Sequence, residues 1–232
     1  MNLFYANPKD CSDDTLLLKG QEARHVSKVL RYREGDSILV TDGQGHRFEG
    51  VVQSIRKSEV EVRVEKKIFE EPAKRDITMA LGVIKKRDRL EFAVEKAVEL
   101  GVNRIALYHG DHTEKGKVRM DRVESTIMSA MKQSLRYYLP KFDLYKSMDD
   151  LMEARSDAEF VVADQNSTSS KLNLSHNSSE IVLLVGPEGG FSERERKLWE
   201  SDSVKSSTVL LGDKRLRAET AAVVMVMKAV WD

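Results

Sequence analysis

The stretch VGPEGGF (residues 185–191) places three glycines and a proline directly after the apolar run IVLLV (181–185). Glycine-rich turns after buried strands commonly hold phosphate, but the phosphate motifs GxxxxGK[ST] and GxGxxG are both absent here. The turn carries Glu188 instead, and Glu193 and Glu195 follow it. The stretch therefore predicts either a tight strand-to-helix turn or a site for a ligand with positive charge and hydrogen-bonding edges.

A second glycine-ended apolar run occurs in LLGDKRLRAETAAVV (210–224). Lys214, Arg215 and Arg217 precede a predicted helix, and Glu219 lies in its first turn, where a carboxylate complements the helix dipole. Taken alone, such a basic run is equally consistent with a solvated loop and with a binding site. Two such loops at neighbouring strand ends favour a pocket, and S-adenosylmethionine, with its sulfonium, ammonium and adenine, is a ligand of the required chemistry.

The segment HGDH (109–112) offers two histidines and an aspartate that could bind zinc. The remaining histidines are scattered along the sequence, and no second cluster completes a set of ligands. We therefore expect no metal site.

Composition limits the classes of protein that remain. The 232 residues contain 38 basic and 38 acidic side chains, so a nucleic-acid site would have to be a local cluster. The single cysteine, Cys11, excludes an internal disulfide, and the N-terminus lacks the layout of a signal peptide. No apolar run approaches the roughly 20 residues that span a membrane. We expect a cytoplasmic protein.

Two regions with different patterns are expected to position these loops. Residues 37–66 alternate between apolar and polar in the manner of a small antiparallel sheet or barrel, preceded by a short helix within residues 19–36. After the polar segment 69–76, strands and helices alternate, with a long helix expected over about 119–138. This second pattern predicts an α/β domain with a parallel sheet, whose ligands lie beyond the carboxyl ends of the strands. Ser192 and Glu195 form a predicted capping box.

Five motifs, in this order, resemble those of the RsmE family of ribosomal RNA uridine N3-methyltransferases, which belongs to the SPOUT superfamily. The likeness covers most of the chain, and the motifs that carry it are HVSKVLR (25–31), GVIKKRDRLEFAVEKAVELGV (82–102), AMKQSLRYYLP (130–140), VGPEGGFSERE (185–195) and LGDKRLRAETA (211–221).

The resemblance implies a PUA-like RNA-binding β-barrel domain over residues 1–72 and a SPOUT methyltransferase domain over 73–232. It implies a deep trefoil knot and a cofactor site within about 160–232, although knotted connections are rare in proteins in general. The implied reaction is S-adenosylmethionine-dependent methylation of N3 of a uridine, known as U1498, in 16S ribosomal RNA. The implied partners are that RNA, within the small ribosomal subunit, and a second copy of the chain in a homodimer.

Matching positions assign roles to individual residues. The cofactor would be held by Leu184, Gly186, Pro187, Glu188, Gly189, Gly190, Leu211, Gly212, Leu216, Arg217 and Thr220. RNA would be contacted by His25, Lys28, Arg31, Lys85, Lys86, Arg87, Arg89, Gln133, Lys214 and Arg215.

Catalysis requires stabilising the negative charge that develops on the uracil oxygens when N3 loses its proton. Arg217 is the first candidate for this role, followed by Arg136 and Lys214. Glu219 either accepts the proton or only caps its helix. The family pattern has arginine where this chain has Lys214 and glutamate where it has Lys132. Lysine lacks the planar donor geometry of arginine.

Two alternative functions are ribose 2′-O-methylation by another SPOUT enzyme and a non-catalytic RNA-binding assembly factor.

Overall fold

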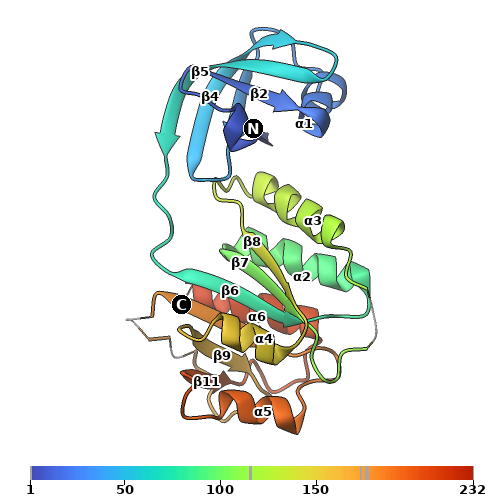
Figure 1. The fold of residues 1–232 in the computed structure, drawn as a ribbon, viewed down its shortest axis with the longest axis vertical. Coiled ribbons are helices and arrows are strands. Elements are labelled where there is room, and N and C mark those ends of the chain that lie inside the picture. Colours follow the sequence, from blue (N-terminus) through green and yellow to red (C-terminus); the bar gives the residue numbers. More distant parts are fainter. Residues whose placement is uncertain (1, 115–116, 173, 176–177, 232) are drawn as a thin grey trace. The chain divides into compact units, whose positions relative to one another are not determined.

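The computed structural model describes residues 2–114, 117–172, 174–175 and 178–231 (Figure 1). These residues divide into two compact units. The first comprises Met1–Pro72, of which Met1 is not described, together with Met131–Leu139, and the second comprises Ala73–Ala130 and Pro140–Asp232, with the exceptions above. Each unit is described by itself.

The first unit is built around a sheet with the strand order β1-β3-β4-β5-β2. Alternating residues of the long strand β4 are buried, as the sequence pattern predicts, and Phe48 and Val52 pack with Phe4, Leu18 and Val60 in its core. The elements of this unit are β1 (Leu3–Tyr5), η1 (Pro8–Asp10), β2 (Thr15–Lys19), α1 (Gly20–Arg24), the π-helical turn η2 (His25–Val29), β3 (Ser37–Thr41), β4 (His46–Ile55) and β5 (Glu59–Phe69).

Residues 131–139 belong to the first unit, although the predicted boundary at residue 72 places them in the second region. The turn between β3 and β4 supplies their backbone partners. Leu139 N donates to Gly43 O at 2.9 Å, and Gly45 N donates to Tyr137 O at 2.9 Å. Tyr138 Oη donates to Glu70 O at 2.8 Å. Hydrogen bonds between residues distant in sequence therefore tie this segment to the rest of the first unit.

The helix α3 (Met120–Gln133) is shorter than the helix expected over 119–138. Leu135 has a φ of 55°, a left-handed conformation that an α-helix cannot continue through. Helical spacing predicts an apolar stripe of Val123, Ile127, Met131 and Leu135; the first three side chains are buried, but Leu135 is 44% exposed. The periodicity therefore located the helix but not its end.

The second unit contains a parallel sheet with the order β11-β9-β10-β6-β7-β8. Its strands are β6 (Asp76–Gly82), β7 (Arg104–Tyr108), β8 (Lys141–Tyr145), β9 (Glu159–Ala163), β10 (Glu180–Val185) and β11 (Ser206–Val209). Residues Ile181 to Val185 of β10 are all buried, as expected for a strand covered on both faces.

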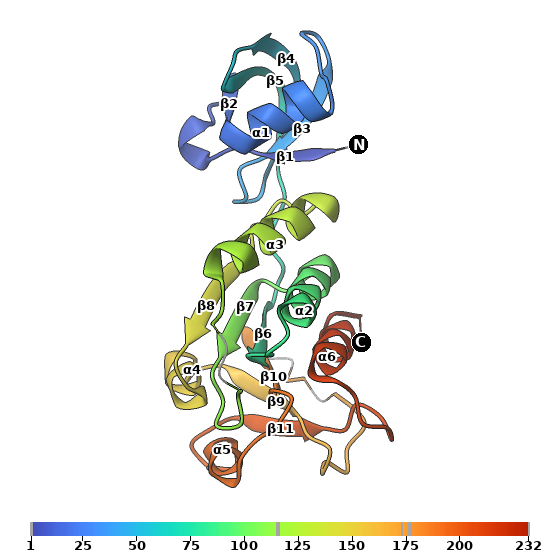
Figure 2. The same cartoon turned by 90° about the vertical axis from the view of Figure 1, so that its right-hand side faces the viewer.

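Helices cover both faces of this sheet (Figure 2). Helices α2 (Arg87–Leu100) and α6 (Ala218–Trp231) pack together on one face, and α4 (Met148–Ala154) and α5 (Glu193–Trp199) pack together on the other. Gly101 ends α2 with a φ of 115°, a left-handed conformation that glycine adopts readily. No helix in the described ranges is long and apolar enough to cross a membrane.

We predict that replacing Gly45 with alanine destabilises the first unit more than replacing Gly35. Both glycines have positive φ, 94° and 92°, so each substitution strains the backbone by about 1 kcal/mol. Only at Gly45 would the new Cβ meet another group, 2.3 Å from Tyr138 Oη, which adds about 1–3 kcal/mol. Urea unfolding measures the difference, and equal losses in the two variants would contradict the packing described here.

Candidate functional site

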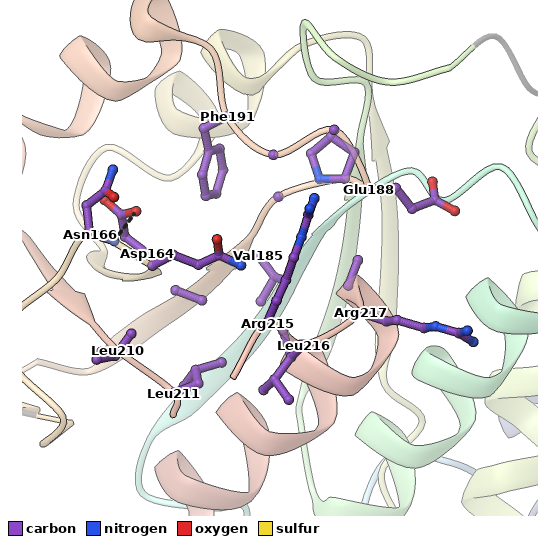
Figure 3. Close-up of a pocket in the computed structure, with 18 of the residues that line it drawn as sticks. Asp164, Asn166, Val185, Glu188, Phe191, Leu210, Leu211, Arg215, Leu216 and Arg217 are labelled. Atoms are coloured by element: carbon purple, nitrogen blue, oxygen red, sulfur yellow. Dashed lines mark hydrogen bonds between the residues drawn. The ribbon is translucent and has the colours of Figure 1, made fainter. Parts of the chain in front are cut away.

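A cavity of about 550 Å³ opens at the carboxyl ends of β9, β10 and β11 (Figure 3). Its volume lies in the range typical of small-molecule sites. The lining residues come from the ends of these strands and the loops that follow them, with additions from α2, α5 and α6. They are Arg89, Ala163, Asp164, Gln165, Asn166, residues 185–191, Arg196, residues 209–212, Lys214, Arg215, Leu216, Arg217, Ala218 and Ala221.

The cavity combines apolar and charged walls. Phe191, Leu210 and Leu216 supply apolar surface, while Asp164 and Arg215 bring opposite charges. In Figure 3 the side chain of Arg215 extends into the cavity toward the glycine-rich loop (residues 186–191), whereas Glu188 and Arg217 point away from its centre. A ligand with both apolar and charged groups fits this lining.

The glycine-rich loop makes contacts that only glycine permits. Gly190 has a φ of 71°, and its N–H donates to Pro187 O at 2.9 Å, which closes the turn. A Cβ on Gly189 would lie 2.7 Å from the Cβ of His112, and one on Gly82 would lie 2.5 Å from Pro187. The loop therefore packs closely against the end of β6 and against the segment that follows β7.

Glu188 is engaged with the protein rather than left free. Its Oε2 accepts a hydrogen bond of 3.2 Å from the backbone N–H of Lys85, in the connection between β6 and α2. The side chain of Lys85 in turn pairs with Glu114. Glu188 thus fastens the glycine-rich loop to the neighbouring strand end.

An ion pair at the end of β9 escaped the sequence analysis. Arg196 Nη1 lies 2.6 Å from Asp164 Oδ2, and only 9% of the Asp164 side chain is exposed. Asp164 Oδ1 also accepts from the N–H of Asn166 at 3.1 Å. The available signal was an acidic residue at the carboxyl end of the buried run EFVVAD (159–164), the position where ligands of parallel sheets lie.

The predicted catalytic residues have different surroundings. Arg217 lines the cavity. Glu219 is buried in the first turn of α6, and its Oε1 lies 3.5 Å from Arg89 Nε. Its Oε2 has no hydrogen-bond partner among the described residues. Arg136 belongs to the first compact unit and is outside the cavity lining, and burial lowers the pKa of its guanidinium to about 10.

Most of the residues assigned to the cofactor line the cavity. Leu184 and Thr220 do not: Leu184 is fully buried in the sheet core, and Thr220 is exposed on α6. The cofactor residues that line the cavity are Gly186, Pro187, Glu188, Gly189, Gly190, Leu211, Gly212, Leu216 and Arg217.

The residues assigned to RNA fall into separate groups. Lys28 and Arg31 are exposed beside the half-buried His25 in the first unit, and Gln133 is exposed at the end of α3. In the second unit, Arg89, Lys214 and Arg215 line the large cavity, and Lys86 is exposed next to its neighbours Lys85 and Arg87.

A second basic segment lies beside Lys85 and Arg87 and was missed by the sequence analysis. Lys117, Arg119 and Arg122 line the same small cavity of about 40 Å³ as those two residues. In the sequence these cations are interspersed with apolar and acidic residues, so no basic run marked them. The fold thus gathers cations from two segments that are far apart in the sequence.

Lys132, which departs from the family pattern, has a clear partner within the first unit. Its ammonium group pairs with the carboxylate of Glu22 on α1, and both side chains are largely buried. The basic residue at this position is therefore matched by a nearby acidic one.

The HGDH segment (109–112) is hydrogen-bonded to the start of α5 through Asp111. Asp111 accepts from Arg194 at 2.9 and 3.0 Å and from Ser192 Oγ at 2.5 Å. These hydrogen bonds lower the pKa of the Asp111 carboxyl to about 2, with Arg194 the main cause. Among the described residues, no group of three or more histidine, cysteine, aspartate or glutamate side chains could hold a metal ion.

Comparison with known proteins places the chain in a family. The family profile described as an RNA methyltransferase domain matches residues 70–230, and that of an RNA methyltransferase PUA domain matches residues 18–65. Ribosomal RNA small subunit methyltransferase E of Mesomycoplasma hyopneumoniae is 25% identical over all of both chains. The protein of that name from Bacillus subtilis is 28% identical, over 89% of this chain and 86% of its own.

Solved structures agree with these matches. The probable rRNA-methyltransferase of Porphyromonas gingivalis has a TM-score of 0.83 and 29% identity over all of both chains. The Ribosomal RNA small subunit methyltransferase E of Neisseria gonorrhoeae, solved bound to S-adenosyl methionine, has a TM-score of 0.83 and 28% identity, covering 100% of this chain and 98% of that one.

The chain therefore belongs to the RNA methyltransferase family, in its RsmE branch, and the resemblance read from the five motifs is confirmed. The N-terminal unit is correspondingly PUA-like. The protein is an RNA methyltransferase that uses S-adenosylmethionine, as the sequence predicted.

We predict that the Asp111 carboxyl titrates near pH 2 in the folded protein, below the roughly 3.9 of an unfolded chain. Because the folded-state pKa is the lower one, the stabilisation is complete above about pH 4 and is lost as the pH falls through 2. About a third of the side chain is exposed, so solvent reduces the effect. Carboxyl NMR titration measures this pKa.

The variant Arg194→Gln should raise the pKa of Asp111 toward its ordinary value. The control Arg119→Gln removes a guanidinium that pairs with Asp121 and should leave the pKa of Asp111 unchanged. An unchanged Asp111 titration in Arg194→Gln would exclude the ion pair as its cause.

Proposed function

We propose that this protein methylates N3 of a specific uridine in 16S ribosomal RNA, with S-adenosylmethionine as the methyl donor. One observation carries the proposal: the 550 Å³ cavity brings the glycine-rich loop and the segment LGDKRLRAET (211–220) together at the carboxyl ends of the strands. The relatives named as small-subunit ribosomal RNA methyltransferases support the choice of RNA.

The residues present fit the cofactor. Phe191, Leu210 and Leu216 can pack against adenine, while the main-chain groups of residues 186–190 and 211–216 can pair with its polar edge. Gly190 and Gly212 have open space where a Cβ would stand, since no atom lies within 4 Å of that position. The carboxylate of Asp164 is also part of the lining, where it is paired with Arg196.

S-adenosylmethionine supplies an activated methyl group, so the chain's own task is alignment and charge stabilisation. Positioning of two reactants is worth about 7–11 kcal/mol of a barrier in favourable cases. Arg217 and Lys214 line the cavity and can stabilise negative charge on the uracil oxygens as N3 loses its proton.

Glu219 is placed to act on this proton or to position Arg89. Its carboxylate is buried, 3.5 Å from the Arg89 guanidinium, and one oxygen has no hydrogen-bond partner among the described residues. A buried unpaired carboxylate oxygen is costly, so a further donor would be favourable here. Glu219 itself is outside the cavity lining, whereas Arg89 is part of it, so the contacts favour the positioning of Arg89.

Two further expectations complete the proposal for the second unit. We propose that the chain forms a trefoil knot here. After the outer strand β11 the chain returns, and α6 packs against β10 and β6. Leu210 N donates to Ser169 O, in the β9–β10 connection, at 2.7 Å.

We also propose a homodimer, because Phe92, Met227 and Trp231 leave apolar surface exposed on α2 and α6.

The first unit and the basic residues are proposed to hold the RNA. His25, Lys28 and Arg31 would contact it from the PUA-like unit, and the cations around the small cavity would contact phosphates from the methyltransferase unit. A cytoplasmic location, inside the compartment that contains ribosomes, follows from this substrate.

Nucleoside mass spectrometry of 16S ribosomal RNA from a deletion strain tests the reaction. We expect N3-methyluridine to be lost and to return when the gene is restored. Retained N3-methyluridine would contradict the proposed substrate, and loss of a ribose-methylated nucleoside instead would indicate 2′-O-methylation.

We predict that Arg217→Ala lowers the single-turnover methylation rate by about 10²–10³-fold, the usual loss on removing one stabilising donor. Arg217→Lys, which keeps the charge but not the planar donors, should fall between this variant and the wild type. Lys197→Ala, an exposed change on α5 outside the cavity lining, is the control. A wild-type rate in Arg217→Ala would remove this residue from the mechanism.

A further inference from the structure

The residues Tyr108 to His112, called here the support segment, run behind the glycine-rich loop without lining the cavity. The hydroxyl of Tyr108 donates to Val185 O at 3.0 Å, at the point where β10 ends and the loop begins. Tyr108 is fully buried, and burial, assisted by the charge of Glu195, raises the pKa of its hydroxyl well above the ordinary value. The proton needed for this hydrogen bond is therefore always present.

The middle of the loop is held by His112. Its Nδ1 lies 3.2 Å from Gly189 O, within hydrogen-bond distance. The backbone and Cβ of His112 also stand where a Cβ on residue 189 would be, at 3.0 Å and 2.7 Å. The loop is thus both bonded to and packed against the support segment.

The end of the loop is held by Glu195, a fully buried carboxylate on α5. Its Oε2 accepts from the N–H of Ser192 at 2.8 Å, which is the capping-box hydrogen bond. Its Oε1 accepts from the N–H of Asp111 at 3.0 Å. One carboxylate therefore bridges the end of the glycine-rich loop and the support segment.

A helix cap requires only the first of these two hydrogen bonds. The second joins two segments that are 84 residues apart and contributes nothing to the start of α5. Burying a charged group is costly unless its oxygens are satisfied, and here two backbone donors meet the two oxygens. Glu195 is therefore placed to do more than begin a helix.

We propose that Glu195 is a positioning residue that, with Tyr108 and His112, fixes the glycine-rich loop in the shape that receives the cofactor. The inference rests on the proposed function of that loop as the S-adenosylmethionine site. It also gives the HGDH segment a role as the support of the loop.

The variant Glu195→Gln separates the two roles of this side chain. Glutamine is accepted at this position of a capping box, so α5 keeps its cap. It has only one acceptor oxygen, so the N–H of Asp111 would face the amide nitrogen and remain unpaired. Glu193→Gln is the matched control, because Glu193 is exposed on the same helix and is outside the cavity lining.

Titration calorimetry with S-adenosylmethionine and amide hydrogen exchange together test the proposal. For Glu195→Gln we expect a Kd about tenfold higher, faster exchange over residues 186–192, a raised KM for S-adenosylmethionine and a kcat within about twofold. Unchanged far-ultraviolet circular dichroism would show that the helices remain. Glu193→Gln should match the wild type in every measurement.

His112→Ala is a second variant in case Glu195→Gln does not fold. His112 is exposed, so its loss removes the contact with Gly189 O at little cost to the core. We expect weaker binding and faster exchange at Gly189 and Gly190. Wild-type affinity and exchange in both variants would overturn the inference while leaving the proposed function intact, whereas absence of binding by the wild type would contradict both.

Discussion

The parallel pairing of β10 with β9 on one side and β6 on the other is the constraint on which the site depends. In this register Leu184 lies opposite both Val162 and Ala80, so the three strands end at the same edge. Three connections must then leave from one small area. Glycine at residues 82 and 189 accommodates this crowding, because a Cβ at either position would collide with a neighbouring segment of the chain.

Much of the fold followed from hydrophobic periodicity and local signals. The buried strands β6, β9 and β10, the glycine that ends α2 and the capping box of α5 were all marked in the sequence. Strand β8 was not, because it is an edge strand with the mixed sequence KFDLY and partial burial. Helix α3 was given the wrong end because its stop is a left-handed Leu135, a conformation that leucine rarely adopts and that sequence does not signal.

The site was predictable where its residues lie in continuous motifs and not where distant segments meet. The glycine-rich loop and the segment 211–217 were found because backbone chemistry is visible in glycine spacing. The pairs Asp164–Arg196 and Arg89–Glu219 were not, because each joins separate elements and local sequence does not indicate which partner a charged residue meets. Arg89 is an example: its basic neighbours in the sequence predicted an RNA contact, but they gave no sign of its position beside a buried carboxylate and the cavity.

The placement of residues 131–139 has a consequence for how this protein can change. The first compact unit is discontinuous in sequence, so a recombination event that replaces only one of its two pieces leaves the other piece unmatched. Gly45 leaves room for Tyr138, and Gly43 O accepts from Leu139 N, so each piece is shaped to the other. The PUA-like unit therefore cannot be exchanged between relatives as one contiguous cassette. Its variation is tied to the gene segment that encodes the middle of the methyltransferase unit.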